Sequence, residues 1–197
     1  MQGFPDTILV TMTQHHFRAR PISAETLAEV NPAEGLRFYR ERFANAGDFT
    51  FVLVGNIVPD SVRPLVERYL ASLPSTGREE RWRDIAQMPP KGVVEKVVRK
   101  GTEPQANTLM VFSGPFEYTP ANRFALRALT DVFQLRLNET LRERLGGTYS
   151  PSVGGAGSRI PRQEYSIQIQ FGSAPETVES LTRTVFALID TLKAQGP

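Results

Sequence analysis

The strongest constraint on the fold is the alternation of side chains along residues 163–171. Tyr165, Ile167, Ile169 and Phe171 recur at every second position, with serine and glutamine between them. Successive side chains of a strand point to opposite faces of its sheet, so this strand has one apolar and one polar face. A strand that is packed on one side and wet on the other is typical of an antiparallel sheet.

Long amphipathic helices are predicted on either side of this strand. Residues 121–145 follow Thr119-Pro120 and carry apolar residues at steps of three or four, which is the period of a helix with one buried stripe. The stripe comprises Leu126, Leu129, Phe133, Leu137 and Leu141. A second helix is predicted over 176–194, with a capping box at Ser173–Glu176. Between the first helix and strand 163–171, residues 149–157 are predicted to form a strand.

The rest of the chain predicts three more strands and three more helices. Helices are expected over 4–20, 33–46 and 60–72, and strands over 93–100 and 108–114. Residues 49–56 (FTFVLVGN) are apolar at nearly every position, as in a strand buried on both faces in the middle of a sheet. We therefore predict an α+β fold of about five largely antiparallel strands, with helices packed on one face. Residues 1–197 are expected to form one domain, with an internal surface linker over 75–92.

Composition excludes several classes of function. The 23 basic and 21 acidic residues leave a net charge of only +2, and the basic residues are scattered rather than gathered into the one-signed stripe of a nucleic-acid-binding protein. No apolar run approaches the roughly 20 residues of a membrane-spanning helix, and the first residues do not read as a secretory signal. The absence of cysteine excludes disulfides, thiolate metal sites and a cysteine nucleophile.

Catalytic motifs of the common hydrolases are also missing. His15 and His16 are the only histidines, and adjacent side chains diverge too far to hold one ion together easily. Neither H-E-x-x-H nor its inverse H-x-x-E-H occurs, and there is no G-x-S-x-G nucleophile motif. Glycines 154, 155 and 157 lack the spacing of a phosphate-binding loop and indicate a close-packed strand instead. We therefore expect this chain to bind no zinc.

The remaining candidate site is the segment 141–150 (LRERLGGTYS), where the long helix breaks at a double glycine. Arg142 and Tyr149 stand seven residues apart across that break. Taken alone, these residues favour a structural interpretation, with Arg142 as a solvated residue near a helix C-terminus and Tyr149 as a half-buried strand residue.

Three segments, in order, resemble the pitrilysin/insulinase (inverzincin) family of zinc peptidases. Residues 38–56 resemble its helix-then-strand segment, 60–74 the following helix with its terminal leucine-proline, and 141–150 its L-R-E-x-x-G-x-x-Y-S segment. The resemblance covers roughly residues 33–194 and concerns the C-terminal type of domain. It is closest to the PqqL-like group of bacterial periplasmic zinc proteases.

The resemblance implies that this chain is part of a larger peptidase whose α+β domains enclose a chamber. The zinc would be held by another domain, through the inverted motif that is missing here. Arg142 and Tyr149 would stabilise the carbonyl of a peptide substrate, with Arg144 as a neighbouring competitor for the arginine role. The implied partners are the peptide and the remaining domains, and the implied location is the periplasm, with the cytoplasm left open. A structural or scaffolding domain of the same fold is the alternative, and a small-ligand binding module is a third.

Overall fold

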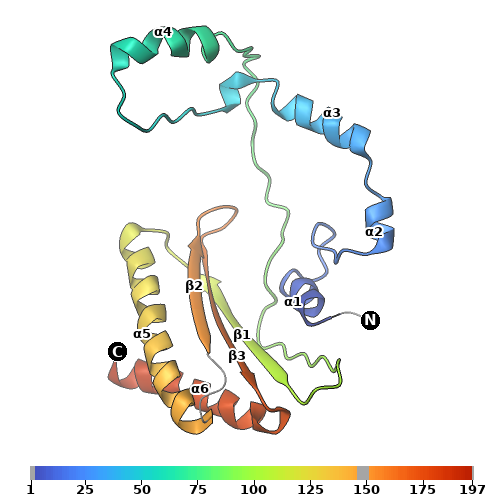
Figure 1. Cartoon of the computed structure of the whole chain (residues 1–197), viewed down its shortest axis with the longest axis vertical. Helices are drawn as coiled ribbons and strands as arrows, with labels where there is room; N and C mark the ends of the chain where they lie inside the picture. The colour runs from blue at the N-terminus through green and yellow to red at the C-terminus, as the bar shows by residue number, and fades with distance from the viewer. Residues whose placement is uncertain (1–2, 146–150, 197) are drawn as a thin grey trace. The chain divides into compact units, whose positions relative to one another are not determined.

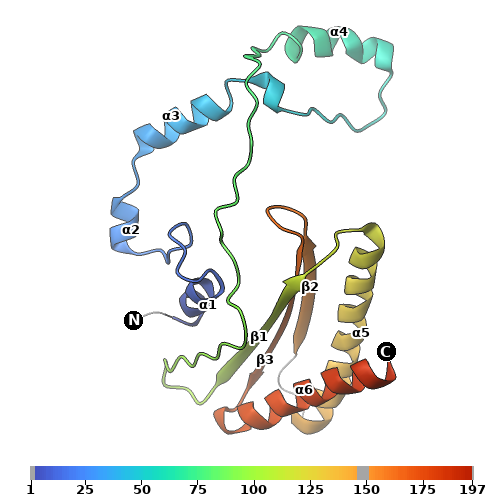
Figure 2. The same ribbon diagram turned by 180° about the vertical axis from the view of Figure 1, so that it is seen from behind.

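The chain forms two compact units, residues Gln2–Pro90 and Lys91–Pro197. The computed structural model describes residues 3–145 and 151–196, apart from the side chains of residues 142–145, and is drawn from two sides in Figures 1 and 2. The boundary between the units falls within residues 75–92, the segment predicted to be a surface linker.

The unit 91–197 is built on a three-stranded antiparallel sheet in the order β1-β3-β2. Strand β1 spans Ala106–Pro115, β2 spans Ser152–Ser158 and β3 spans Glu164–Ser173. Ile169, in the central strand, stands opposite Met110 of β1 and Val153 of β2. The antiparallel pairing predicted from the alternation in residues 163–171 is confirmed.

Two helices cover the apolar face of this sheet, α5 over Pro120–Leu145 and α6 over Val178–Gln195, as Figure 1 shows. Buried side chains of α5, β3 and α6 form one hydrophobic cluster: Phe133, Leu137, Leu141, Ile169, Phe171, Leu181 and Val185. Gln168 and Gln170 on the opposite face of β3 are exposed. Helices on one face of an antiparallel sheet are therefore confirmed.

The buried stripe of α5 differs from the predicted stripe at one position. Leu129 is 47% exposed, whereas Thr130 is only 5% exposed. Strand β2 approaches the helix here so closely that a Cβ on Gly155 would lie 2.7 Å from the Cγ2 atom of Thr130. The narrow space between α5 and β2 therefore accommodates Thr130 packed on Gly155, and Leu129 points to solvent instead.

The start of α6 also differs from the prediction. Ser173, expected to cap the helix, is the buried last residue of β3, and its hydroxyl donates to the carbonyl oxygen of Ala174. A short 3₁₀ turn, η2 (Pro175–Thr177), precedes the helix, so Thr177 occupies the capping position. The extra turn lies between strand and helix because β3 runs two residues further than the alternation indicated.

The unit 2–90 contains short helices and no strand among its described residues. They are α1 (Phe4–Met12), α2 (Ala24–Ala28), α3 (Pro32–Arg42), the 3₁₀ turn η1 (Ala46–Asp48) and α4 (Pro59–Tyr69). The side chain of Asn31 caps α3 by accepting hydrogen bonds from the backbone N–H groups of Ala33 and Glu34, as its place before a proline predicts.

Two predicted strands, 49–56 and 93–100, are not strands in the structure, so the described residues hold three strands rather than about five. A strand needs a neighbour to satisfy its backbone groups. Residues 50–57 make no backbone hydrogen bond within the described chain. The prediction for 49–56 depended on its apolar pattern alone. Such a pattern indicates a segment that prefers burial, but it does not show which strands would pair with it.

Candidate functional site

The candidate residues Arg142 and Tyr149 lie at the end of α5 and just beyond it. Position 142 belongs to the last turn of the helix, and its side chain is outside the described residues, as is that of Arg144. Tyr149 falls within 146–150, also outside the described residues. The chain is described again from Pro151, so the site can be located by the residues on either side of it.

A single side chain, Gln134 of α5, fastens the start of β2 to the helix. Its Nε2 donates to the carbonyl oxygen of Pro151 at 2.8 Å, and its Oε1 accepts from the backbone N–H of Val153 at 2.6 Å. Nε2 also donates to Asn138 Oδ1 at 3.0 Å. Both polar atoms of the Gln134 amide are thus hydrogen-bonded. The first anchored residue after Tyr149 is Pro151, two positions further along the chain.

Helical spacing relates this anchor to the candidate arginine. Gln134, Asn138 and position 142 follow one another at intervals of four residues, which places them on the same side of an α-helix. Sequence reasoning missed Gln134, because it stands as one polar residue in a leucine-rich helix and its partners come 17 and 19 residues later. The intervals of four from Arg142 back to Asn138 and Gln134 were the only signal available.

The polar face of the sheet is the second feature near this segment. Gln168 and Gln170 of β3 are exposed, and Gln170 Nε2 donates to Asn107 Oδ1 of β1 at 3.1 Å. Ser152 and Gly154 of β2 pair with these two glutamines. Leu109 and Val111 of β1 also pair with these glutamines and stand on the same face. The centre of this face therefore offers amide and hydroxyl groups beside two aliphatic side chains, and no charge.

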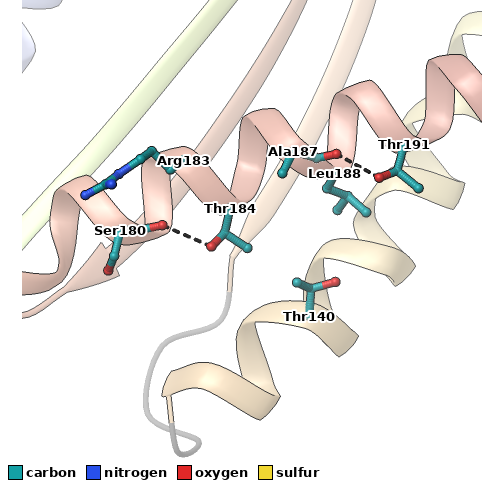
Figure 3. A pocket seen from close by; sticks show the side chains of 7 residues that line it. All are labelled: Thr140, Ser180, Arg183, Thr184, Ala187, Leu188 and Thr191. Carbon is teal, nitrogen blue, oxygen red and sulfur yellow. Dashed lines mark hydrogen bonds between the residues drawn. The ribbon is translucent and has the colours of Figure 1, made fainter.

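An open groove lies between α5 and α6 and is shown in Figure 3. Its volume is about 510 Å³, and it is lined by Thr140, Ser180, Arg183, Thr184, Ala187, Leu188 and Thr191. The hydroxyls of Thr140, Thr184 and Thr191 each donate to a backbone carbonyl of their own helix. Arg183 pairs with Glu179 at 3.2 Å. This groove contains no acid–base pair or nucleophile that would make it an active site.

A zinc ion does not fit the residues that the structure describes. No three His, Asp or Glu side chains converge within that part of the chain. His16 is engaged on both ring nitrogens, since Nδ1 accepts from the Arg18 backbone N–H at 3.2 Å and Nε2 lies 3.0 Å from the Ile85 carbonyl oxygen. The Nε2-protonated neutral tautomer satisfies both contacts, which gives His16 a structural role.

Shifted pKa values occur in the unit 2–90, away from the α5 terminus in sequence. The hydrogen bond and charge of Arg20 lower the pKa of Glu29, and the same contacts raise the pKa of Arg20. The pKa of Glu25 is lowered by hydrogen bonds from Ser23 and from its own backbone. All three groups lie at the surface, and each shift comes from a local ion pair or hydrogen bond, which indicates local stabilisation.

None of the described helices is both long enough and apolar enough to span a bilayer.

The unit 91–197 is an antiparallel sheet covered on one face by two helices, and its described residues hold no cluster of three metal-ligating side chains. In the comparison with known families, residues 30–197 match the family described as the peptidase M16 inactive domain. The chain belongs to this family of zinc peptidases, which confirms the resemblance found in the sequence.

The similar proteins are all much longer than this chain. It is 26% identical over 185 residues to the probable zinc protease PqqL of Haemophilus influenzae, covering 87% of this chain and 19% of that protein. The periplasmic protease PqqL from Escherichia coli shares the fold, with a TM-score of 0.76, 22% identity, and coverage of 98% of this chain and 22% of that one. A variant of the ferredoxin protease FusC, solved in complex with Arabidopsis ferredoxin, gives a TM-score of 0.76 at 19% identity, covering 97% of this chain and 20% of that one.

The chain thus spans about a fifth of the length of the relatives it matches. The Haemophilus influenzae relative is a probable zinc protease by name, and the domain that matches this chain is described as inactive. Zinc is thus the metal of the peptidase family. The described residues of this chain contain no set of side chains that could hold it.

Proposed function

We propose that this chain is the substrate-contacting, non-zinc-binding domain of a zinc metalloendopeptidase. In this proposal Arg142 and Tyr149 donate hydrogen bonds to the carbonyl oxygen of a peptide held near a zinc that another domain binds. A guanidinium and a phenol are suitable donors, because negative charge develops on that oxygen when the peptide bond is attacked.

The observation that carries the proposal is the pair of hydrogen bonds at Gln134, which donates to the carbonyl oxygen of Pro151 and accepts from the N–H of Val153. It ties the chain that leaves Tyr149 to the side of α5 on which the four-residue spacing places position 142. Position 142 follows Leu141, a fully buried residue of α5, and the chain beyond 146–150 is bonded to the same helix through Pro151 and Val153. Carbonyl stabilisation requires donors whose positions are set before the reaction.

The uncharged polar face of the sheet supports a polypeptide as the substrate. Gln168, Gln170 and Asn107 present amide groups that can bond to a peptide backbone without selecting its charge. The E. coli relative is described as periplasmic, and we propose the same location for the protein that contains this chain.

The test is peptidase kinetics on the full-length protein. Arg142→Ala and Tyr149→Phe are each expected to lower kcat/KM by roughly ten- to a thousand-fold, as loss of one oxyanion donor does. Arg144→Ala tests the neighbouring candidate for the arginine role, and under this proposal it is expected to keep most of the activity. Full activity in both the Arg142 and Tyr149 variants would disprove the assigned roles.

The alternative is a structural domain of the same fold, which the family description as an inactive domain favours. The two functions differ in a simple observation. An H-x-x-E-H motif elsewhere in the same polypeptide, or in a neighbouring gene, supports the peptidase. If the full-length protein hydrolyses no peptide, either with or without a chelator, the structural role is supported.

A further inference from the structure

The segment predicted to be a surface linker begins under firm restraint in the unit 2–90. The buried Asn45 donates from Nδ2 to the carbonyl oxygen of Arg78 at 3.1 Å, and its Oδ1 accepts from the N–H of Thr76 at 2.8 Å. Glu80 then pairs with Arg78 and with Arg42 of α3, each at 2.6 Å. The chain is therefore held against the end of α3 as far as Glu80.

Residues 81–90, which we call the strap, are fastened a second time by the turn that follows α1. Gln14 Nε2 donates to the carbonyl oxygen of Met88 at 3.1 Å and to that of the next residue at 3.3 Å. His16 Nε2 lies 3.0 Å from the carbonyl oxygen of Ile85 and donates to it in the tautomer described above. Two side chains of the turn thus hold three backbone carbonyls of the strap.

Backbone strain is concentrated at this contact. Among the described residues, the non-glycine positions with a positive φ are Gln14 (51°), His15 (57°) and Ala86 (59°). This left-handed conformation is uncommon for a residue with a Cβ, and each instance lowers the population of the conformation by roughly five- to thirtyfold. Two of the three stand in the turn, where helices commonly end on glycine, and the third follows Ile85 in the strap.

The contacts that hold the strap are weak enough for this strain to oppose them. The bonds from Gln14 are exposed to water, and an ordinary hydrogen bond favours the bonded state by a net factor of only about two to ten. Apolar burial adds little, since the strap residues Trp82 and Met88 are 65% and 37% exposed. Strained residues persist only where their surroundings impose the strain, and they cluster at switch regions.

We propose that residues 81–90 form a releasable strap, which the bonds from Gln14 and His16 close and which opens when they break. In the closed state the chain leaves the unit 2–90 only at Pro90. In the open state it leaves at Glu80, and the freed residues add up to about 35 Å of reach. The strap thus sets the length of free chain that joins residues 2–90 to residues 91–197.

The test measures trypsin cleavage after Arg81 and Arg83, two exposed residues of the strap, in the folded full-length protein. The protease cuts such sites in the open state, so the cleavage rate reports the open population. Gln14→Ala removes the hydrogen bonds and keeps the left-handed position, and it is expected to raise the rate about two- to tenfold. Cleavage after Arg127 of α5 reports global unfolding and should not change.

His15→Gly is the companion variant. His15 shares the left-handed backbone of Gln14, but it makes no hydrogen bond to the strap within the described chain. Glycine adopts this conformation without strain, so His15→Gly relieves the strain and keeps every contact of the strap. It is expected to lower the cleavage rate at least about twofold. The two variants of neighbouring residues should therefore change the open population in opposite directions.

Several results would overturn the proposal. Equal cleavage rates in the wild-type protein and Gln14→Ala, or no cleavage after Arg81 and Arg83 in any variant, would show that the strap does not open. An unchanged or faster rate in His15→Gly would show that the turn stores no strain against closure. Wild-type cleavage as fast as that of an unfolded peptide of the same sequence would show that the strap never closes. Peptidase activity enters none of these measurements, so the strap stands or falls separately from the proposed function.

Discussion

The carboxamide of Gln134 accepts a hydrogen bond from the backbone N–H of Val153 at 2.6 Å, and its other end donates to the residue two positions earlier. The link crosses from the middle of α5 to the first residues of β2, and the candidate segment 146–150 lies in the loop that it closes. Gln134 therefore anchors to α5 the chain that follows the candidate segment.

Gln134→Leu is expected to lower the free energy of unfolding of the unit 91–197 by about 1–3 kcal/mol, because the N–H of Val153 and the carbonyl of Pro151 lose their partner. Urea unfolding followed by circular dichroism measures the change. Gln168→Leu, at an exposed position of β3, is the matched control and should stay within about 0.5 kcal/mol. Equal effects of both substitutions would show that the amide contributes no anchoring.

Gly155→Ala is expected to destabilise the same unit by about 1–3 kcal/mol, because the added methyl group overlaps Thr130 Cγ2 and separates β2 from α5. Gly154→Ala is the control, since nothing lies within 4 Å of a Cβ at that position. Thermal melts of both variants test the difference.

The double variant Gly155→Ala with Thr130→Ser provides a further test of this contact. Removing Cγ2 from residue 130 should restore part of the stability lost in the single variant, so that the two substitutions are not additive. Additive effects would mean that the alanine acts through the strand itself.

Leu137→Ala is expected to cost about 2–5 kcal/mol, because Leu137 is completely buried at the centre of the hydrophobic cluster and its removal leaves a cavity. Leu135→Ala, in the same helix but 64% exposed, is expected to change stability by no more than about 0.5 kcal/mol. Denaturant midpoints of the two variants, compared at the same slope, check the assignment of the buried stripe.

The ion pair of Arg20 and Glu29 makes a prediction about pH. Arg20 lowers the pKa of Glu29, so the pair favours the folded state above the ordinary glutamate pKa, and that contribution is lost as the pH falls through the lower folded value. In Arg20→Ala the pKa of Glu29 should rise to its ordinary range, as followed by carbonyl NMR. The pKa of Glu25, which Ser23 lowers, should not change and serves as the control. If the pKa of Glu29 also stays unchanged, the ion pair does not form in solution.

Within the unit 91–197 the sequence predicted β3 and α5 because their signals are local, although it placed a strand at 93–100 that does not form. The alternation along β3 and the leucine spacing of α5 each identify an element without knowledge of its neighbours. Leu129 was placed in the core wrongly, since periodicity cannot distinguish it from Thr130 until Gly155 of another element is known. Gln134 was missed for the same reason.

Residues 49–56 show where prediction from a local pattern fails. Their composition correctly indicates a segment that prefers burial, yet a strand forms only where neighbours supply hydrogen bonds, and these are absent from the described residues. The candidate pair was identified through resemblance to a family, which the comparisons confirmed. The roles of Arg142 and Tyr149 remain predictions, because they depend on atoms outside the described residues.

The uneven distribution of buried side chains between the two units has a consequence for any measurement of stability. Almost the whole hydrophobic cluster belongs to residues 91–197, so cooperative melting can arise only there, while residues 2–90 would lose structure gradually and with little heat. The 197-residue chain is then not a two-state system. A single melting temperature measured on it would report one half of the polypeptide and leave the other half unseen.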